Sequence, residues 1–143
     1  MAVYGTVLVP TDGSVCSKKA EEHAVALAKV HGSTVVFLFV MDTVDNYVEG
    51  MMAAVRRDLE AAGNRTLASA RRVAALAEVH AEAELLDGSP AEVILRRATD
   101  FDLLVMGSHG KGLWRRLTVG SVTQAVLHRI TRPVLLVPCS DRT

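Results

Sequence analysis

The sequence predicts an α/β domain in which helices cover both faces of an open, parallel β-sheet. Strand-like and helical segments alternate five times along the chain. Residues 34–40 are continuously apolar, as expected for a strand covered on both faces. The connections are long enough for the right-handed crossovers that parallel strands need. Because 143 residues is close to the usual size of one domain, we expect a single domain spanning residues 1–143.

The first strand and helix are predicted in direct succession. A short apolar run at residues 4–9 is rich in β-branched side chains and predicts the strand. Residues 14–31 carry small and apolar side chains at helical spacing, which predicts the helix. Either Ser14 or Ser17 can cap its start, and Gly32 supplies a left-handed stop.

Two further strands and a long helix follow. Residues 34–40 form the second predicted strand, and residues 81–86 form the third. Between them, one apolar face traces a long helix over residues 48–77. Gly63 and Asn64 lie in its middle, where they can kink or divide it.

The next helix has a strong start signal. Ser89 is the expected cap, Pro90 lies in the first turn, and Glu92 follows three residues after the cap. This helix is expected to end near Thr99, and residues 102–106 then form a fourth strand that leads straight into a glycine. A glycine-rich turn is therefore expected at the end of that strand.

A second capping box opens the last helix. Ser121 is the expected cap and Gln124 its partner, with the helix continuing to about Ile130. Residues 133–138 form the last predicted strand.

Charge and composition exclude several classes of protein. Sixteen basic residues balance sixteen acidic ones, which argues against a general role in binding nucleic acid or membrane surfaces. The amino-terminal segment lacks a basic leader, and no apolar run approaches the roughly 20 residues that span a bilayer. We therefore expect a cytoplasmic protein.

The two cysteines, Cys16 and Cys139, lie near opposite ends of the sequence. Neither has a partner at zinc-ligand spacing, so a thiolate metal site has no support. A disulfide between them is one alternative, but two buried or idle thiols in a reducing compartment is the interpretation that the sequence favours.

An anion site is expected toward the carboxyl end of the sequence. No aspartate or glutamate occurs between Leu103 and Ser140, although five basic residues fall there. A positive region of this kind favours a negatively charged ligand. The five basic residues are Lys111, Arg115, Arg116, Arg129 and Arg132.

Two glycine-bearing turns follow the first and fourth predicted strands, at residues 11–14 and 107–110. In doubly wound sheets, ligands bind beyond the carboxyl ends of the strands, so both turns would face one crevice. Glycines let backbone amides approach a row of phosphates, and a helix that begins at Ser121 adds unpaired donors. Gly107, Gly110 and Gly112 supply the turn, and Lys111, Arg115 and Arg116 can neutralise the phosphates, with oxygen contacts from Ser108, Ser121 and Thr123.

The pattern is neither a P-loop nor a dinucleotide fingerprint. Gly107 and Gly112 have P-loop separation, but Leu113 follows where that motif needs lysine. The pattern instead resembles the ATP-binding branch of the universal stress protein family, whose signature is glycine, two residues, glycine, nine residues, glycine and then serine or threonine. Gly107, Gly110, Gly120 and Ser121 fill these places. The resemblance extends over most of the sequence, including residues 9–14, 40–42 and 88–92.

The resemblance implies the fold and the ligand in more detail. It implies a five-stranded sheet in the order 3-2-1-4-5, a homodimer formed through residues 134–137, and ATP, or ADP or AMP, bound together with Mg²⁺. Asp12 would lie near the ribose, and the Val40 backbone would recognise adenine. The residues implied to bind the nucleotide are Pro10, Thr11, Asp12, Val40, Met106, Gly107, Ser108, His109, Gly110, Lys111, Gly112, Gly120, Ser121, Val122 and Thr123.

Several of these residues have simpler interpretations. Asp12 can brace a turn, although its place opposite the glycine loop favours a ligand role. His109 is a weak candidate for catalysis, since a lone histidine between serine and glycine more often shapes a loop. Arg115 and Arg116 can form a solvated face, and Trp114 can be ordinary packing. No catalytic residue is expected.

Three functions therefore compete. A nucleotide-binding regulatory module is favoured, because a phosphate loop occurs without a recognisable general base. Slow Mg²⁺-dependent ATP hydrolysis, with Asp12 or a loop hydroxyl on the ion, is the enzymatic alternative. An interaction module that has lost its ligand is the third, and the intact glycine signature makes it less attractive.

Overall fold

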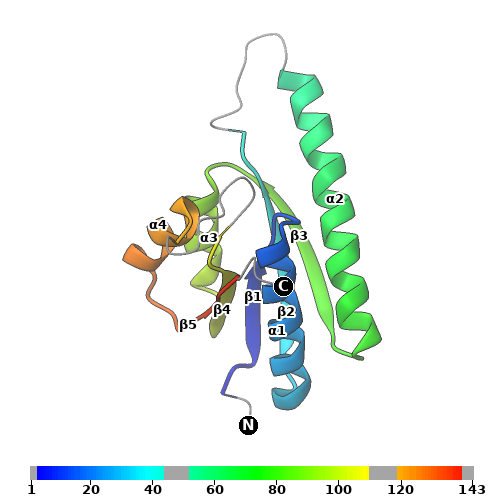
Figure 1. The fold of residues 1–143 in the computed structure, drawn as a ribbon, viewed down its shortest axis with the longest axis vertical. Coiled ribbons are helices and arrows are strands. Elements are labelled where there is room, and N and C mark those ends of the chain that lie inside the picture. Colours follow the sequence, from blue (N-terminus) through cyan, green and yellow to red (C-terminus); the bar gives the residue numbers. More distant parts are fainter. Residues whose placement is uncertain (1–2, 44–51, 110–118, 140–143) are drawn as a thin grey trace.

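The computed structural model describes residues 3–43, 52–109 and 119–139. Five parallel strands form one sheet in the order β3-β2-β1-β4-β5, which confirms the expected fold and strand order (Figure 1). The strands are β1 (Thr6–Pro10), β2 (Thr34–Met41), β3 (Ala81–Asp87), β4 (Leu103–Gly107) and β5 (Val134–Val137). The helices are α1 (Val15–His31), α2 (Met52–Leu76), α3 (Pro90–Ala98) and α4 (Ser121–Arg129).

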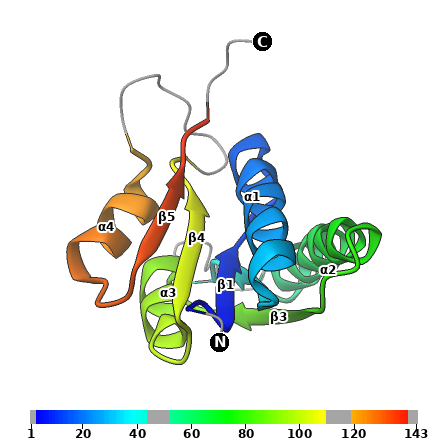
Figure 2. The same ribbon diagram turned by 90° about the horizontal axis from the view of Figure 1, so that it is seen from below.

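Helices cover both faces of the sheet. Figure 2 shows α1 and α2 on one side and α3 and α4 on the other. Alternate residues of one strand face these two layers, because successive side chains of a strand point to opposite faces. Val7 and Val9 pack with α1 and α2, whereas Leu8 packs with α3 and α4. All three are fully buried, so β1 lies at the centre of both cores.

Helix α1 begins and ends as the sequence predicts. The Ser14 side chain accepts a hydrogen bond from the Ser17 backbone N–H at 3.2 Å, which caps the first turn. Gly32 ends the helix in the left-handed conformation with φ 69°. Of the two candidate caps, Ser14 and Ser17, the structure selects Ser14.

Helix α2 runs without interruption from Met52 to Leu76, so of the two alternatives for Gly63 and Asn64, a kink or a division, the division does not occur. Gly63 serves close packing instead. A Cβ atom there would lie 2.6 Å from Leu85 Cδ1 and 2.8 Å from Phe39 Cδ1. The glycine thus lets α2 approach β2 and β3. The predicted start of this helix at residue 48 lies outside the described residues.

The structure confirms Ser89 as the cap of its helix, but neither of the two predicted capping boxes forms. Gly120, with extended backbone, is the N-cap of α4, and Ser121 is already its first helical residue. Ser89 is the N-cap of α3, but its side chain makes no capping hydrogen bond. The Glu92 carboxylate instead forms an ion pair with Arg129 of α4. This pair joins the two helices on their shared face of the sheet.

The two cysteines are not idle thiols, because Cys16 and Cys139 form a disulfide. They are 123 residues apart in sequence, yet their Cα atoms lie 5.0 Å apart. Strand order explains this approach. β4 lies between β1 and β5, and the start of α1 lies over the end of β4 beside the segment that leaves β5.

Among the described residues, no helix combines the length and the apolar character that a membrane span requires.

Candidate functional site

A cavity of about 330 Å³ lies beyond the carboxyl ends of β1 and β4. The volume falls in the lower part of the size range of small-molecule sites. The cavity lies at the position where open α/β sheets bind ligands. Residues from both ends of the sequence line it. They are Pro10, Thr11, Asp12, Ser17, Leu38, Val40, Asp42, Pro90, Ile94, Met106, Gly107, His109, Gly120, Ser121, Val122 and Thr123.

The turn after β1 forms one wall of the cavity. The Asp12 Oδ1 atom accepts a hydrogen bond from the Ser14 backbone N–H at 2.9 Å, and Gly13 takes φ 82° between them. The Thr11 backbone N–H donates to the Leu38 carbonyl oxygen at 2.8 Å, which ties the turn to β2. Asp12 therefore braces the turn as the simpler interpretation predicts, while it also lines the cavity.

A buried carboxylate stands behind this wall. Glu21 of α1 is 3% exposed, and it accepts a hydrogen bond from the Thr11 hydroxyl at 2.5 Å. The Thr11 hydroxyl also lies 3.1 Å from Ser17 Oγ. Burial raises the pKa of the Glu21 carboxyl above its ordinary value of 4.5, and the hydrogen bond from Thr11 opposes this effect only in part.

Glu21→Gln is expected to stabilise the protein at pH 7. The folded state holds the Glu21 proton more tightly than the unfolded state does. The stability that this carboxyl contributes is thus complete below its unfolded pKa of about 4.5 and is lost as the pH rises through the folded pKa. Glutamine keeps an acceptor for Thr11 but carries no buried charge. The advantage of the variant should therefore shrink as the pH falls through the folded pKa toward 4.5, and it should be smallest below 4.5.

Urea unfolding at several pH values measures this difference. Glu22→Gln, which removes a carboxylate from α1 at the exposed neighbouring position, is the matched control. A Glu21→Gln advantage that does not depend on pH would contradict the assignment.

The turn after β4 forms the opposite wall. The Ser108 backbone N–H donates to the Val137 carbonyl oxygen at 3.0 Å, and the Gly120 N–H donates to the Ser108 carbonyl oxygen at 2.7 Å. The Ser108 hydroxyl oxygen lies 3.1 Å from His109 Nδ1. These bonds fix the turn against both β5 and the start of α4. Ser108, a predicted ligand residue, lies behind the wall and does not line the cavity.

His109 carries a polar atom that needs a partner. Its side chain is buried, with 8% exposed, and lines the cavity. The Nε2 atom is buried and makes no hydrogen bond within the described residues. A buried polar atom without a partner costs free energy, so the surroundings of this ring favour a polar group that the described residues do not supply.

The first turn of α4 lines the cavity on the same side as the turn after β4. It contains no acidic residue, so the positive end of the helix dipole is not neutralised there. Gly120, Ser121, Val122 and Thr123 line the cavity. The Thr123 hydroxyl donates to the Gly107 carbonyl oxygen at 3.0 Å, which locks α4 onto the end of β4. Helix amino ends of this kind bind phosphate and other anions.

Apolar side chains supply the remaining surface. Leu38 and Val40 come from β2, Ile94 and Pro90 from α3, and Met106 from β4. Such a surface suits a flat apolar ring. Five lining residues were not predicted, namely Ser17, Leu38, Asp42, Pro90 and Ile94. The resemblance pointed to residues 40–42 and 88–92, so Asp42 and Pro90 had a sequence signal.

The predicted residues Gly110, Lys111 and Gly112 lie outside the described residues, as do Trp114, Arg115 and Arg116. The other predicted residues, except Ser108, lie together around the cavity. Within the described parts of the protein, no group of three or more histidine, cysteine, aspartate or glutamate side chains is arranged to hold a metal ion. Asp12 and Asp42 are the carboxylates among the lining residues.

These observations define a doubly wound α/β domain with a ligand-sized cavity at the carboxyl edge of its sheet. The sequence model of the universal stress protein family matches residues 4–138. The chain belongs to the universal stress protein family.

Relatives match the sequence over nearly its full length. Universal stress protein MJ0531 of Methanocaldococcus jannaschii is 33% identical over 140 residues, which cover 94% of this chain and 82% of that protein. The solved structure of MJ0577 from the same organism has a TM-score of 0.86 at 26% identity, covering 98% of this chain and 99% of the other. A universal stress protein solved in complex with cAMP has a TM-score of 0.75 at 28% identity, covering 97% and 100%.

Proposed function

We propose that this protein is a cytoplasmic regulatory module that binds ATP, or ADP or AMP, as a member of the ATP-binding branch of its family. One observation carries the proposal. The acid-free amino end of α4 faces the same cavity as the turn after β1 and an apolar wall from β2 and α3. An anion site next to a surface for a flat ring matches the two ends of a nucleotide.

The residues divide by chemistry into three groups. The Val40 backbone, with Leu38 and Ile94 beside it, would contact the adenine ring, and Asp12 would accept hydrogen bonds from the ribose hydroxyls. The backbone amides of residues 121–123 and of the turn after β4 would hold the phosphates, together with Gly110, Lys111 and Gly112, and Gly120 would let the phosphates approach the backbone closely. A hydrogen bond with the nucleotide would satisfy the His109 Nε2 atom, which has no partner among the described residues.

Mg²⁺ would accompany a triphosphate in this proposal. Mg²⁺ prefers oxygen ligands, keeps several waters, and binds through one or two carboxylates together with the substrate's phosphates. Asp12 and Asp42 are carboxylates on the cavity wall. The relative solved with cAMP supports an adenine nucleotide as the ligand class.

Ser121→Asp is expected to weaken ATP binding by at least about tenfold. The new carboxylate would repel the phosphates at the amino end of α4. It would also favour the helix dipole, so folding should not suffer. Equilibrium titration with labelled ATP measures the change, and a wild-type protein without saturable binding would falsify the proposed function.

Two controls make this test specific. Gln124→Glu adds the same charge to α4 at an exposed position that does not line the cavity, and it should leave affinity near the wild-type value. Adenosine lacks phosphates and should bind equally to wild type and Ser121→Asp. An equal loss of adenosine and ATP would show that the helix end does not face the phosphates.

A homodimer through β5 is the second part of the proposal. Val134–Val137 forms the edge strand of the sheet, and Leu135 on it is 36% exposed. An open apolar edge favours pairing with a second copy of the protein. Sedimentation velocity should show a dimer for wild type and a monomer for Leu135→Lys. A wild-type protein that sediments as a monomer at micromolar concentration argues against this interface.

A further inference from the structure

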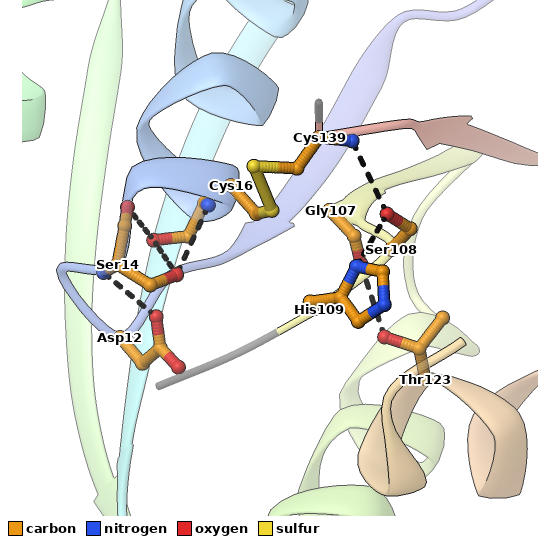
Figure 3. The surroundings of a disulfide bond; sticks show 9 residues. Asp12, Ser14, Cys16, Gly107, Ser108, His109, Thr123 and Cys139 are labelled. Atoms are coloured by element: carbon orange, nitrogen blue, oxygen red, sulfur yellow. Dashed lines mark hydrogen bonds between the residues drawn. A yellow bond between two sulfur atoms is a disulfide. The ribbon is translucent and has the colours of Figure 1, made fainter. Parts of the chain in front are cut away.

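The Cys16–Cys139 disulfide joins the two walls of the nucleotide cavity. Cys16 is the second residue of α1 and follows directly on the turn that carries Asp12 and Ser14. Cys139 is two residues beyond β5, which pairs with β4. Figure 3 shows the bond between the turn with Asp12 and the turn with Ser108.

Hydrogen bonds lead from this disulfide to the cavity. The Cys139 backbone N–H donates to Ser108 Oγ at 3.3 Å, and Ser108 Oγ lies 3.1 Å from His109 Nδ1. His109 lines the cavity, and its buried Nε2 atom has no hydrogen-bond partner among the described residues. The bond between the cysteines thus holds the backbone group that orients Ser108, and through it His109 (Figure 3).

Direct packing provides a second connection. A Cβ atom on Gly107 would lie 2.9 Å from both the backbone carbonyl carbon and the backbone carbonyl oxygen of Cys16. The backbone of Cys16 therefore rests against the glycine that begins the turn after β4. A shift of Cys16 therefore displaces Gly107, because close-packed atoms cannot move independently.

We propose that Cys16 and Cys139 form a reversible thiol–disulfide switch that sets the affinity of the cavity for its nucleotide, an inference that rests on the function proposed above. Oxidation removes two electrons and two protons from the two thiols as the S–S bond forms. A low-molecular-weight disulfide such as oxidised glutathione accepts both and is released as two thiols, by way of a mixed disulfide. A dithiol reverses the reaction.

The surroundings of the two sulfur atoms favour exchange at one of them. Cys16 is buried, with 5% exposed, whereas Cys139 is partly exposed. An incoming thiolate therefore attacks the sulfur of Cys139, and Cys16 leaves as the thiolate. The position of Cys16 in the first turn of α1 favours the negative charge of the thiolate. Cytosolic disulfides are in most cases transient, catalytic or redox-sensing, which fits a switch in a cytoplasmic module.

The oxidised protein is the state with the higher affinity. The disulfide fixes the Cys139 N–H against Ser108, so the wall is already in its binding arrangement when the ligand arrives. Reduction should raise the Kd for ATP by about fivefold or more, the lower end of typical coupling between two sites. By linkage, saturating ATP should make the disulfide harder to reduce by the same factor, which is about 21 mV for fivefold.

The experiment uses three forms of the full-length protein: oxidised wild type, wild type reduced with dithiothreitol, and Cys16→Ser/Cys139→Ser. Alkylation of free thiols and intact mass confirm each redox state. Titration with labelled ATP gives each Kd, and circular dichroism confirms that each form is folded. The double variant should bind like reduced wild type and should not respond to dithiothreitol. A glutathione redox titration with and without ATP then measures the reduction potential.

The outcomes separate this inference from the proposed function. A weaker Kd for reduced wild type and a matching shift in potential support the switch. Equal affinities for oxidised and reduced wild type overturn the switch and leave the proposed function intact. Thiols that stay free in excess oxidised glutathione also overturn it. If none of the three forms binds ATP saturably, the proposed function and the switch are both refuted.

Discussion

Cys16→Ser/Cys139→Ser should lower the free energy of unfolding of the oxidised protein by about 2–5 kcal/mol. The bond closes a loop across a sequence separation of 123 residues, so it restricts the unfolded state strongly. Loss of the bond restores that freedom, and the folded state keeps most of its packing. Urea unfolding of the oxidised wild type and of the double variant measures the difference.

Reduced wild type is the matched control for this comparison. It lacks the bond but keeps both cysteine side chains, so it should unfold at nearly the same urea concentration as the double variant. If the double variant is much less stable than reduced wild type, the lost stability comes from packing around Cys16 and not from the disulfide. Equal stability of all three forms would contradict a stabilising role for the bond.

Gly107→Ala should destabilise the protein by about 1–3 kcal/mol and weaken nucleotide binding. The new Cβ atom would lie 2.9 Å from the backbone carbonyl carbon and oxygen of Cys16, which is closer than such atoms pack. The backbone of Cys16 belongs to α1, so it cannot move aside as the end of a flexible side group would. Either α1 or the end of β4 must shift, and both elements contribute residues that line the cavity.

Gly5→Ala is the control for this prediction. Within the described part of the protein, a Cβ atom at Gly5 would approach the Asp102 side chain alone, with Oδ2 at 3.3 Å. This variant should stay within about 0.5 kcal/mol of wild type and should bind ATP normally. Thermal unfolding and ATP titration of both variants measure the effects. A Gly107→Ala protein with wild-type stability would show that α1 and β4 are less tightly packed than the structure indicates.

The order of strands and helices could be read from the sequence because each element carries a local signal. The apolar run of residues 34–40 and the serine and glycine at the ends of residues 14–31 depend on near neighbours only. The 3-2-1-4-5 order came from the family resemblance, since periodicity alone does not fix which strands pair. The grouping of Asp12, Gly107 and Gly120 around one cavity followed from the doubly wound architecture, which places both turns at the carboxyl ends of parallel strands.

Local sequence signals could not predict contacts between residues that are far apart in the sequence. Cys16 and Cys139 have no pattern that links them, and only the folded sheet brings them together. Gly63 looked like a helix breaker because its partners, Phe39 and Leu85, belong to other strands. Ser121 looked like a cap because a preceding glycine with extended backbone can take that role without any side-chain signal.

The described walls of the cavity come from opposite ends of the sequence, the turn after β1 near the start and α4 near the end. A ribosome synthesises the first of these walls long before the second, and folding proceeds from the amino end. We therefore expect a nascent polypeptide to remain without nucleotide until α4 has emerged. A bound nucleotide would then mark a polypeptide whose synthesis has passed that helix.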